Sequence, residues 1–177
     1  MLFRSSGGDP TGGGGGGDDG GGGEVPCPRV DQFVRVRGAD GKIALTHAGR
    51  LTDAHWLWHP VKQCFFRVRA VRIVHDEPIW ELVTANGAVG YSSHSHPVLW
   101  YQEHLGEPIK NIVAADPVLT EIDGELQDSY AVVSTDTGEL GDVVKIEIES
   151  DDPADKIYCY GDSAAKLIAC HNVKIFQ

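Results

Sequence analysis

Apolar and polar residues alternate along three short stretches of the chain, 33–37 (FVRVR), 66–70 (FRVRA) and 144–148 (VKIEI). A period of two places every second side chain on the same face, so we expect each stretch to form a β-strand with one buried face. Apolar residues at helical spacing are not sustained anywhere along the sequence. The pattern therefore predicts an all-β domain.

Turn-forming residues separate the predicted strands. The ranges 79–83 and 88–92 are joined through Thr84-Ala85-Asn86-Gly87, and an Asn-Gly pair favours a tight hairpin. Glycine next to Asp or Thr predicts further turns at 39–41, 123–124, 137–138 and 161–162. No repeat of fixed period is visible, which argues against a propeller or a solenoid.

The glycines are concentrated at one end of the chain. Twelve of the 22 glycines lie between Gly7 and Gly23. Because glycine loses the most backbone entropy on folding, and this stretch offers almost no apolar area, we expect residues 1–26 to be a disordered, flexible linker. The composition changes abruptly at Cys27, so one folded domain is expected over residues 27–172, followed by a short flank, 173–177.

Charge and cysteine content limit the partners and the compartment. The chain has 26 acidic and 15 basic residues, a formal charge of −11, and no basic cluster, so neither a nucleic acid nor an anionic membrane is an expected partner. It also lacks a long apolar stretch and a signal-peptide pattern. The 4 cysteines are too widely spaced for a disulfide framework. We expect a soluble, cytoplasmic protein in a reducing compartment, monomeric as an isolated domain and without a cofactor or metal.

Three places carry residues suited to peptide-bond chemistry. Cys27 is the first residue of the predicted domain, Ser93-His94-Ser95-His96-Pro97-Val98 follows a hairpin strand, and Cys170-His171-Asn172 lies near the C-terminus. In this order they resemble the Hint superfamily, the horseshoe-like all-β fold of inteins, bacterial intein-like domains and hedgehog autoprocessing domains. The resemblance spans Cys27 to Asn172.

The resemblance can be followed motif by motif. The opening block of the family has a first-position Cys and a later Gly-x-Leu, matched by Cys27 and Gly49-Arg50-Leu51. The second block is Thr-x-x-His, matched by Ser93 to His96 with Ser in place of Thr. The closing block is His-Asn, matched by His171-Asn172.

The resemblance implies a role for each matched residue, with the chain's own flanking segments as substrate. Cys27 would attack the Pro26 carbonyl and form a thioester by an N-S acyl shift, assisted by His96 and Ser93. Asn172 would cyclise to a succinimide and release Val173, with His171 supplying the proton. In the penultimate block Cys159 is an accessory candidate, and Cys170 is a second one.

Two flanking residues depart from the family pattern. Splicing inteins are followed by Cys, Ser or Thr, whereas position 173 is Val, so cleavage is expected rather than ligation. Pro26 offers a hindered carbonyl, which predicts slow or absent N-terminal cleavage. The glycine runs resemble linkers near the ends of phage virion proteins, and we hypothesise that the chain is the end of a larger polypeptide.

Other interpretations of the same residues remain open. The domain is alternatively a catalytically silent Hint-like module with a structural or interaction role in a phage virion or surface protein. Cys27 and His96 are alternatively ordinary core residues. A metal-binding β domain would use Cys64, Cys159 or Cys170 with histidines, although no pair has structural-zinc spacing. A Cys-His-Asn protease is disfavoured, because adjacent strand residues point to opposite faces.

Overall fold

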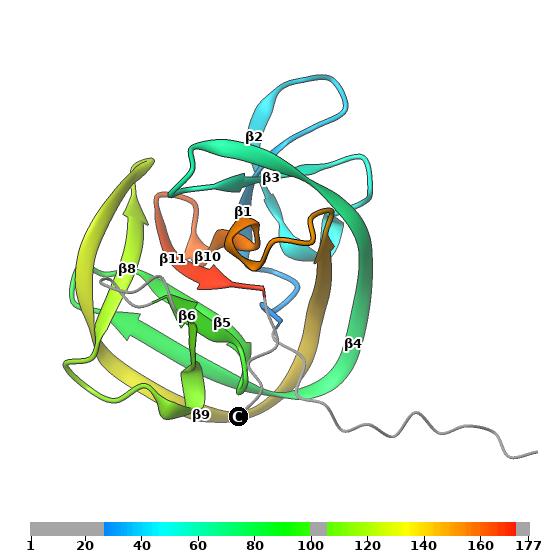
Figure 1. Cartoon of the computed structure of the whole chain (residues 1–177). Coiled ribbons are helices and arrows are strands. Elements are labelled where there is room, and N and C mark those ends of the chain that lie inside the picture. The colour runs from blue at the N-terminus through cyan, green and yellow to red at the C-terminus, as the bar shows by residue number, and fades with distance from the viewer. Residues whose placement is uncertain (1–26, 100–105, 173–177) are drawn as a thin grey trace, which may run out of the picture.

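The computed structural model describes residues 27–99 and 106–172. The predicted linker at 1–26 and the flank at 173–177 lie outside the described residues. Within them, strands form one connected antiparallel sheet, accompanied by three one-turn 3-10 helices and no α-helix (Figure 1). The predicted all-β fold class is confirmed.

The elements follow one another in a simple order along the chain. They are β1 (Phe33–Arg37), β2 (Ile43–His47), η1 (Ala48–Arg50), β3 (Trp56–His59), β4 (Cys64–Thr84), β5 (Val89–Ser93), β6 (Pro97–Leu99), β7 (Gly106–Pro108), η2 (Ile109–Asn111), β8 (Pro117–Ile122), β9 (Glu125–Ile148), η3 (Pro153–Asp155), β10 (Ile157–Ser163) and β11 (Lys166–His171).

Two long paired strands, β4 and β9, form the curved frame of the horseshoe. They pair antiparallel from Val68 opposite Ile148 to Thr84 opposite Ala131, and they curve together around the molecule (Figure 1). Their register shifts at four places, and Asp76 has a positive φ of 58° beside one of them. Such irregularities bend a strand and increase its twist, which lets the pair wrap around β10 and β11.

These long strands correct several sequence predictions. The ranges 66–70 and 79–83 were expected as separate strands, but both belong to β4. The turn predicted at 137–138 lies inside β9, at a register irregularity, because a Gly with a positive φ serves a bulge as well as a turn. The turn predicted at 161–162 lies inside β10, and the chain turns at residues 164–165 instead.

The predicted hairpin at 84–87 and the predicted turn at 123–124 are confirmed. Gly87 has a φ of 87° between β4 and β5, and Thr84 N–H donates to the Ala88 carbonyl at 2.9 Å. Asp123 and Gly124 have φ values of 50° and 87° between β8 and β9. Positive φ at both central residues is what a two-residue hairpin turn requires.

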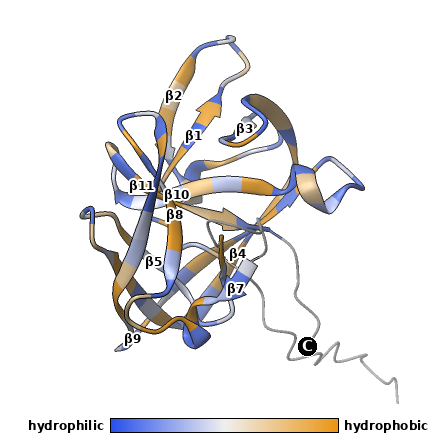
Figure 2. Cartoon of the chain, turned by 60° about the vertical axis from the view of Figure 1, so that its left-hand side comes forward, coloured by the Kyte–Doolittle hydropathy of each residue, from blue (hydrophilic) through white to orange (hydrophobic). Residues whose placement is uncertain are grey.

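The alternating segments bury the face that the pattern predicts. Val34 and Val36 of β1 are buried, as are Val144 and Ile146 of β9, while the intervening Lys145 is exposed. Apolar and polar residues accordingly alternate along the strands in Figure 2. These buried side chains meet those of β10 and β11 in one main core cluster, so the C-terminal hairpin lies at the centre of the domain.

Candidate functional site

The segment that begins at Cys27 is held between β5 and β9. Pro28 forms a bridge with Ser92 of β5, and Arg29 forms one with Val143 of β9. Val144 N–H donates to the Pro28 carbonyl at 2.9 Å. The first described residues therefore run as an added strand between two others, which fixes the backbone on the downstream side of Cys27.

Ser93 forms hydrogen bonds with both the N–H and the carbonyl of Cys27. The Cys27 N–H, which belongs to the peptide linking residues 26 and 27, donates to Ser93 Oγ at 3.1 Å. The Ser93 N–H in turn donates to the Cys27 carbonyl at 2.9 Å. Ser93 is the last residue of β5 and is buried, so its hydroxyl lies beside the upstream peptide of Cys27 with little freedom to leave it.

The Cys27 thiol is buried and neutral at ordinary pH. Its side chain is fully covered and packs with Ile79 and Val143. Burial raises the pKa of the thiol from 9.0 to about 12, a shift that the nearby charge of Lys145 opposes only in part. The thiol must therefore lose its proton to a base as it attacks, because little thiolate exists beforehand.

A tight turn connects Ser93 to His96. The His96 N–H donates to the Ser93 carbonyl at 3.1 Å, which explains why these residues are spaced by three. His96 is fully buried, and burial lowers the pKa of its ring to about 3. The ring packs edge-on against Tyr160, with centroids 4.7 Å apart, and lies 6.4 Å from the ring of Tyr158. At neutral pH it is a neutral imidazole, with one nitrogen as donor and one as acceptor.

Buried polar groups without partners gather around His96. Among the residues that the structure describes, neither ring nitrogen of His96 has a hydrogen-bond partner, and the same holds for Ser95 Oγ. Unpaired buried polar atoms are costly, and they concentrate where a group is kept available for chemistry. The interpretation of His96 as an ordinary core histidine with its hydrogen bonds satisfied thus finds no support in the described residues.

The backbone of Ser93 links Cys27 to His96. Its N–H donates to the Cys27 carbonyl at 2.9 Å, and its carbonyl accepts the His96 N–H at 3.1 Å. Two residues far apart in sequence, Cys27 and His96, are thus both attached to Ser93.

Asn172 is tied to the backbone at both its main chain and its side chain. Its N–H donates to the Lys156 carbonyl at 2.7 Å, and its side-chain nitrogen Nδ2 donates to the Ile146 carbonyl. His171, the last residue of β11, is half-buried, and burial lowers the pKa of its ring despite a hydrogen bond to the Pro153 backbone. His171 is consequently neutral at neutral pH.

Both ends of the predicted domain meet on one edge of β9. The Val144 N–H donates to the Pro28 carbonyl there, and the Ile146 carbonyl accepts from the Asn172 side chain. These two strand positions are about 7 Å apart, since a strand rises about 3.4 Å per residue. The edge opposite to them is occupied by β4. The structure therefore brings the segment after Cys27 and the side chain of Asn172 close together.

The two accessory candidates lie on opposite faces of the C-terminal hairpin. Cys170 is buried in the main core beside Tyr158, whose carbonyl accepts a hydrogen bond from Sγ at 3.4 Å. Cys159 is buried in a second cluster, next to the Glu121 carboxylate that pairs with Arg35 at 2.8 Å. Cys159 thus faces away from Tyr158 and from the site around Cys27.

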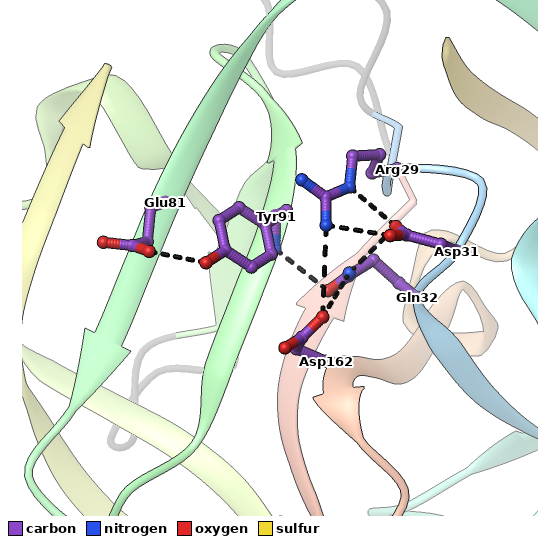
Figure 3. A network of polar contacts seen from close by, with 6 residues as sticks. All are labelled: Arg29, Asp31, Gln32, Glu81, Tyr91 and Asp162. Carbon is purple, nitrogen blue, oxygen red and sulfur yellow. Dashed lines mark hydrogen bonds and ion pairs between the residues drawn. The ribbon is translucent and has the colours of Figure 1, made fainter. Parts of the chain in front are cut away.

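A polar network that the sequence did not reveal fastens the segment after Cys27 (Figure 3). The buried side chain of Gln32 accepts from Tyr91 N–H at 3.0 Å and donates to Asp31 at 3.2 Å. The Arg29 guanidinium lies 4.1 Å from the centroid of the Tyr91 ring and donates to Asp31. The network comprises Arg29, Asp31, Gln32, Glu81, Tyr91 and Asp162. The only sequence signal for it is a short polar stretch between Pro28 and β1.

The described residues show neither a metal-binding cluster nor a membrane-spanning helix. In residues 27–99 and 106–172, no group of three or more His, Cys, Asp or Glu side chains is arranged to hold a metal ion. The same ranges contain no helix long and apolar enough to cross a membrane.

Solved structures share this architecture. A bacterial intein-like domain from Clostridium thermocellum has a TM-score of 0.62 and 12% identity, with 84% of this chain and 99% of that one covered. The Mvu mini-intein of transcription factor IIB has a TM-score of 0.66 and 11% identity, with 82% and 99% covered. A DnaB intein from Synechocystis sp. has a TM-score of 0.63 and 13% identity, with 83% and 98% covered. The chain has the Hint fold.

The predicted resemblance to the Hint superfamily is confirmed at the level of fold, including its horseshoe architecture. Known family models and curated protein sequences give no match to the chain. At 10 to 15% identity the solved structures show the Hint fold alone. What the site does must be argued from its own residues.

Proposed function

We propose that this Hint-fold domain processes its own chain, cleaving at Cys27 and at Asn172 with cleavage favoured over ligation. The observation that supports the proposal is the pair of hydrogen bonds between Ser93 and the Cys27 backbone, at 3.1 and 2.9 Å. A serine that accepts from the N–H of the upstream peptide and also holds the following carbonyl fixes that peptide beside the thiol. The attack of Cys27 on this peptide is intramolecular, and the placement of reacting groups in such reactions can be worth about 7 to 11 kcal/mol at best.

At the N-terminal end the thiol would attack the Pro26 carbonyl. A bond forms between Cys27 Sγ and the Pro26 carbonyl carbon, and the bond from that carbon to the Cys27 nitrogen breaks. One nitrogen of the neutral His96 ring would take the thiol proton, and the other would give its proton to the departing amine. The His96 ring is neutral at neutral pH, so it offers one acceptor nitrogen and one donor nitrogen for these two transfers.

At the C-terminal end Asn172 Nδ2 would attack the carbonyl carbon of Asn172 itself. A succinimide forms, the bond to Val173 breaks, and the proton lost by Nδ2 is returned to the leaving amine through the His171 ring. The Ile146 carbonyl accepts a hydrogen bond from Nδ2, which polarises the N–H that must lose its proton and orients the amide. Val173 has no side-chain nucleophile, so the acyl group has no acceptor for ligation.

Mass spectrometry of the purified chain tests the proposal. Incubation is expected to release residues 173–177 and leave a C-terminal succinimide, and added thiol is expected to release residues 1–26 slowly. Asn172→Ala should abolish only the first product and Cys27→Ala only the second. An intact mass after long incubation, with and without thiol, would refute self-cleavage.

A catalytically silent Hint-fold module is the second candidate. Burial raises the Cys27 pKa to about 12, and the nucleophilic nitrogen of Asn172 is engaged with Ile146, so neither nucleophile is activated in this structure. Under this alternative, Cys27→Ala and Asn172→Ala leave the mass pattern unchanged, because no cleavage occurs in any variant.

A further inference from the structure

A short loop between β9 and β10 carries the C-terminal site. The loop, residues 149–156, includes η3 and is called the η3 loop below. Its last carbonyl, on Lys156, accepts the Asn172 N–H at 2.7 Å, and the backbone of Pro153 hydrogen-bonds the His171 ring. Both residues of the closing His-Asn pair thus depend on where the η3 loop lies.

The η3 loop is held from a distant part of the chain by His59. This residue ends β3 and is buried, with 1% of its surface exposed. Its Nδ1 accepts the Lys62 N–H at 2.9 Å, which leaves the proton on Nε2, and Nε2 donates to the Ala154 carbonyl at 2.7 Å. The tautomer is thereby fixed by the protein itself.

Other contacts brace the η3 loop but lie nearer to solvent. Lys62 pairs with Asp155, and Ser150 Oγ donates to Asp155 at 2.6 Å. The Lys62 side chain is 41% exposed, so this ion pair is screened and weak. Among the described hydrogen bonds of Pro153 and Ala154, the bond from the buried His59 is the one whose partner lies outside both the η3 loop and the C-terminal hairpin.

We propose that His59 is a positioning residue for cleavage at Asn172: its Nε2–H to Ala154 bond sets the η3 loop, and the loop sets His171 and Asn172. The inference rests on the proposed function, which it deepens by naming a residue outside the closing motif. His59 does not touch the reacting atoms, and it acts only through the backbone of the loop. The hydrogen bonds of His59 go to Lys62, Gln63 and Ala154, so the N-terminal site is not expected to depend on it.

Electrostatics provide an independent readout of this arrangement. The groups that act on the His171 ring are His59 from β3, Lys156 from the end of the η3 loop and the Pro153 backbone. Burial, His59 and Lys156 lower the His171 pKa, and the Pro153 bond raises it. The groups around His59 itself are Lys62 and Asp155. Release of the η3 loop would admit water and move the His171 pKa upwards, towards its ordinary value.

The experiment compares His59→Ala and His59→Gln with a control, His55→Ala. The glutamine can keep an N–H donor towards the Ala154 carbonyl. His55 lies directly before β3, and its ring bonds only to Thr52 among the described contacts. Full-length chains are assayed for release of residues 173–177 and for thiol-induced release of residues 1–26. The His171 pKa is measured by NMR titration of the same variants in an Asn172→Ala background, which cannot cleave.

The expected result is a split between the two ends. His59→Ala should slow C-terminal release about 100-fold, the scale of a small misplacement of reacting groups, and leave N-terminal release within about twofold. His59→Gln should recover part of the rate. The His171 pKa should rise more in His59→Ala than in His59→Gln, because both variants remove the charge of His59 but only the alanine frees the η3 loop, and it should not change in His55→Ala. Equal loss at both ends, or the same His171 pKa in His59→Ala and His59→Gln, would overturn the proposal. If the wild-type chain releases nothing, the proposed function fails, whereas the titration still decides the role of His59.

Discussion

Gly90 of β5 leaves room for the aromatic ring that packs on His96, and Gly90→Ala should fill that room. A Cβ at this position would lie 2.6 Å from Tyr160 Cε2 and 2.9 Å from Cζ, well inside contact distance. The added methyl would also approach Ile168 at 3.0 Å. Tyr160 is fully buried and its ring lies edge-on to the His96 ring with centroids 4.7 Å apart, so a shift of the Tyr160 ring is expected to disturb His96.

The cost of this change can be estimated from overpacking. Forcing an extra methyl into a packed core costs about 1 to 3 kcal/mol. For a domain of this size that corresponds to a fall in melting temperature of roughly 3 to 10 °C. Since His96 serves the N-terminal step, thiol-induced release of residues 1–26 should slow more than release of residues 173–177. Thermal unfolding and mass spectrometry measure the two effects.

A matched glycine provides the control. A Cβ on Gly38 would come closest to Asp40 Oδ1, at 3.0 Å, and would lie 4.0 Å from the Lys42 carbonyl. The Asp40 side chain is exposed and can rotate away, at the cost of an exposed hydrogen bond from the Lys42 N–H. Gly38→Ala should therefore change the melting temperature by less than about 1 °C. Tyr160→Leu should relieve the clash, so the cost of Gly90→Ala should shrink in the double variant. Additive costs, or an unchanged melting temperature for Gly90→Ala, would show that the close approach at Gly90 does not constrain Tyr160.

Three further predictions follow from the contacts around Cys27. Ser93→Ala leaves the buried Cys27 N–H without its acceptor, so urea unfolding should show a loss of about 1 to 3 kcal/mol, with slower thiol-induced cleavage; Ser93→Thr, which keeps the hydroxyl, should not. The folded state holds the Cys27 proton more tightly than the unfolded state, so the contribution of the protonated thiol to the free energy of unfolding is complete below pH 9 and is lost as pH rises from 9 towards 12. The difference in unfolding free energy between wild type and Cys27→Ala should therefore fall by about 1 kcal/mol from pH 9 to pH 10. A constant difference would contradict the burial argument. Gln32→Leu leaves the Tyr91 N–H unpaired and should cost about 1 to 3 kcal/mol in urea unfolding, whereas the exposed Asp31→Asn should cost less than about 1.

Local patterns in the sequence predict local structure well in this fold. The alternation at 33–37 and 144–148 identifies the buried face, and Asn86-Gly87 identifies its hairpin, because both signals involve neighbouring residues only. The length of β4 could not be predicted in the same way. Asp76 and Pro78 look like the end of a strand, yet the strand continues through a bulge because β9 pairs with it on both sides of the irregularity.

The site shows a similar division. Motif order and spacing predict Cys27, Ser93, His96 and Asn172 as site residues. In the structure Ser93 hydrogen-bonds to both Cys27 and His96, and the Asn172 side chain hydrogen-bonds to Ile146 of β9. The role of His59 was hidden, because its partner Ala154 lies far along the chain and is a backbone carbonyl, which leaves no trace in residue type. In the sequence, His59 could be listed only among histidines available to a metal.

The shared edge of β9 holds both ends of the described domain. Val144 fixes the strand that follows Cys27 and Ile146 fixes the side chain of Asn172, so both attachments lie on one short, continuous piece of backbone. That piece is paired along its other edge with β4, from Val71 to Ile73, and the side chains of Val144 and Ile146 are buried in the main core. A change in the position of Val144 cannot leave Ile146 behind, since a strand is stiff over so few residues. The sheet thus fixes the distance between these two attachment points, while the η3 loop orients His171 and the main chain of Asn172. This division suits the proposed reaction, whose rate depends on the placement of its own flanking peptides.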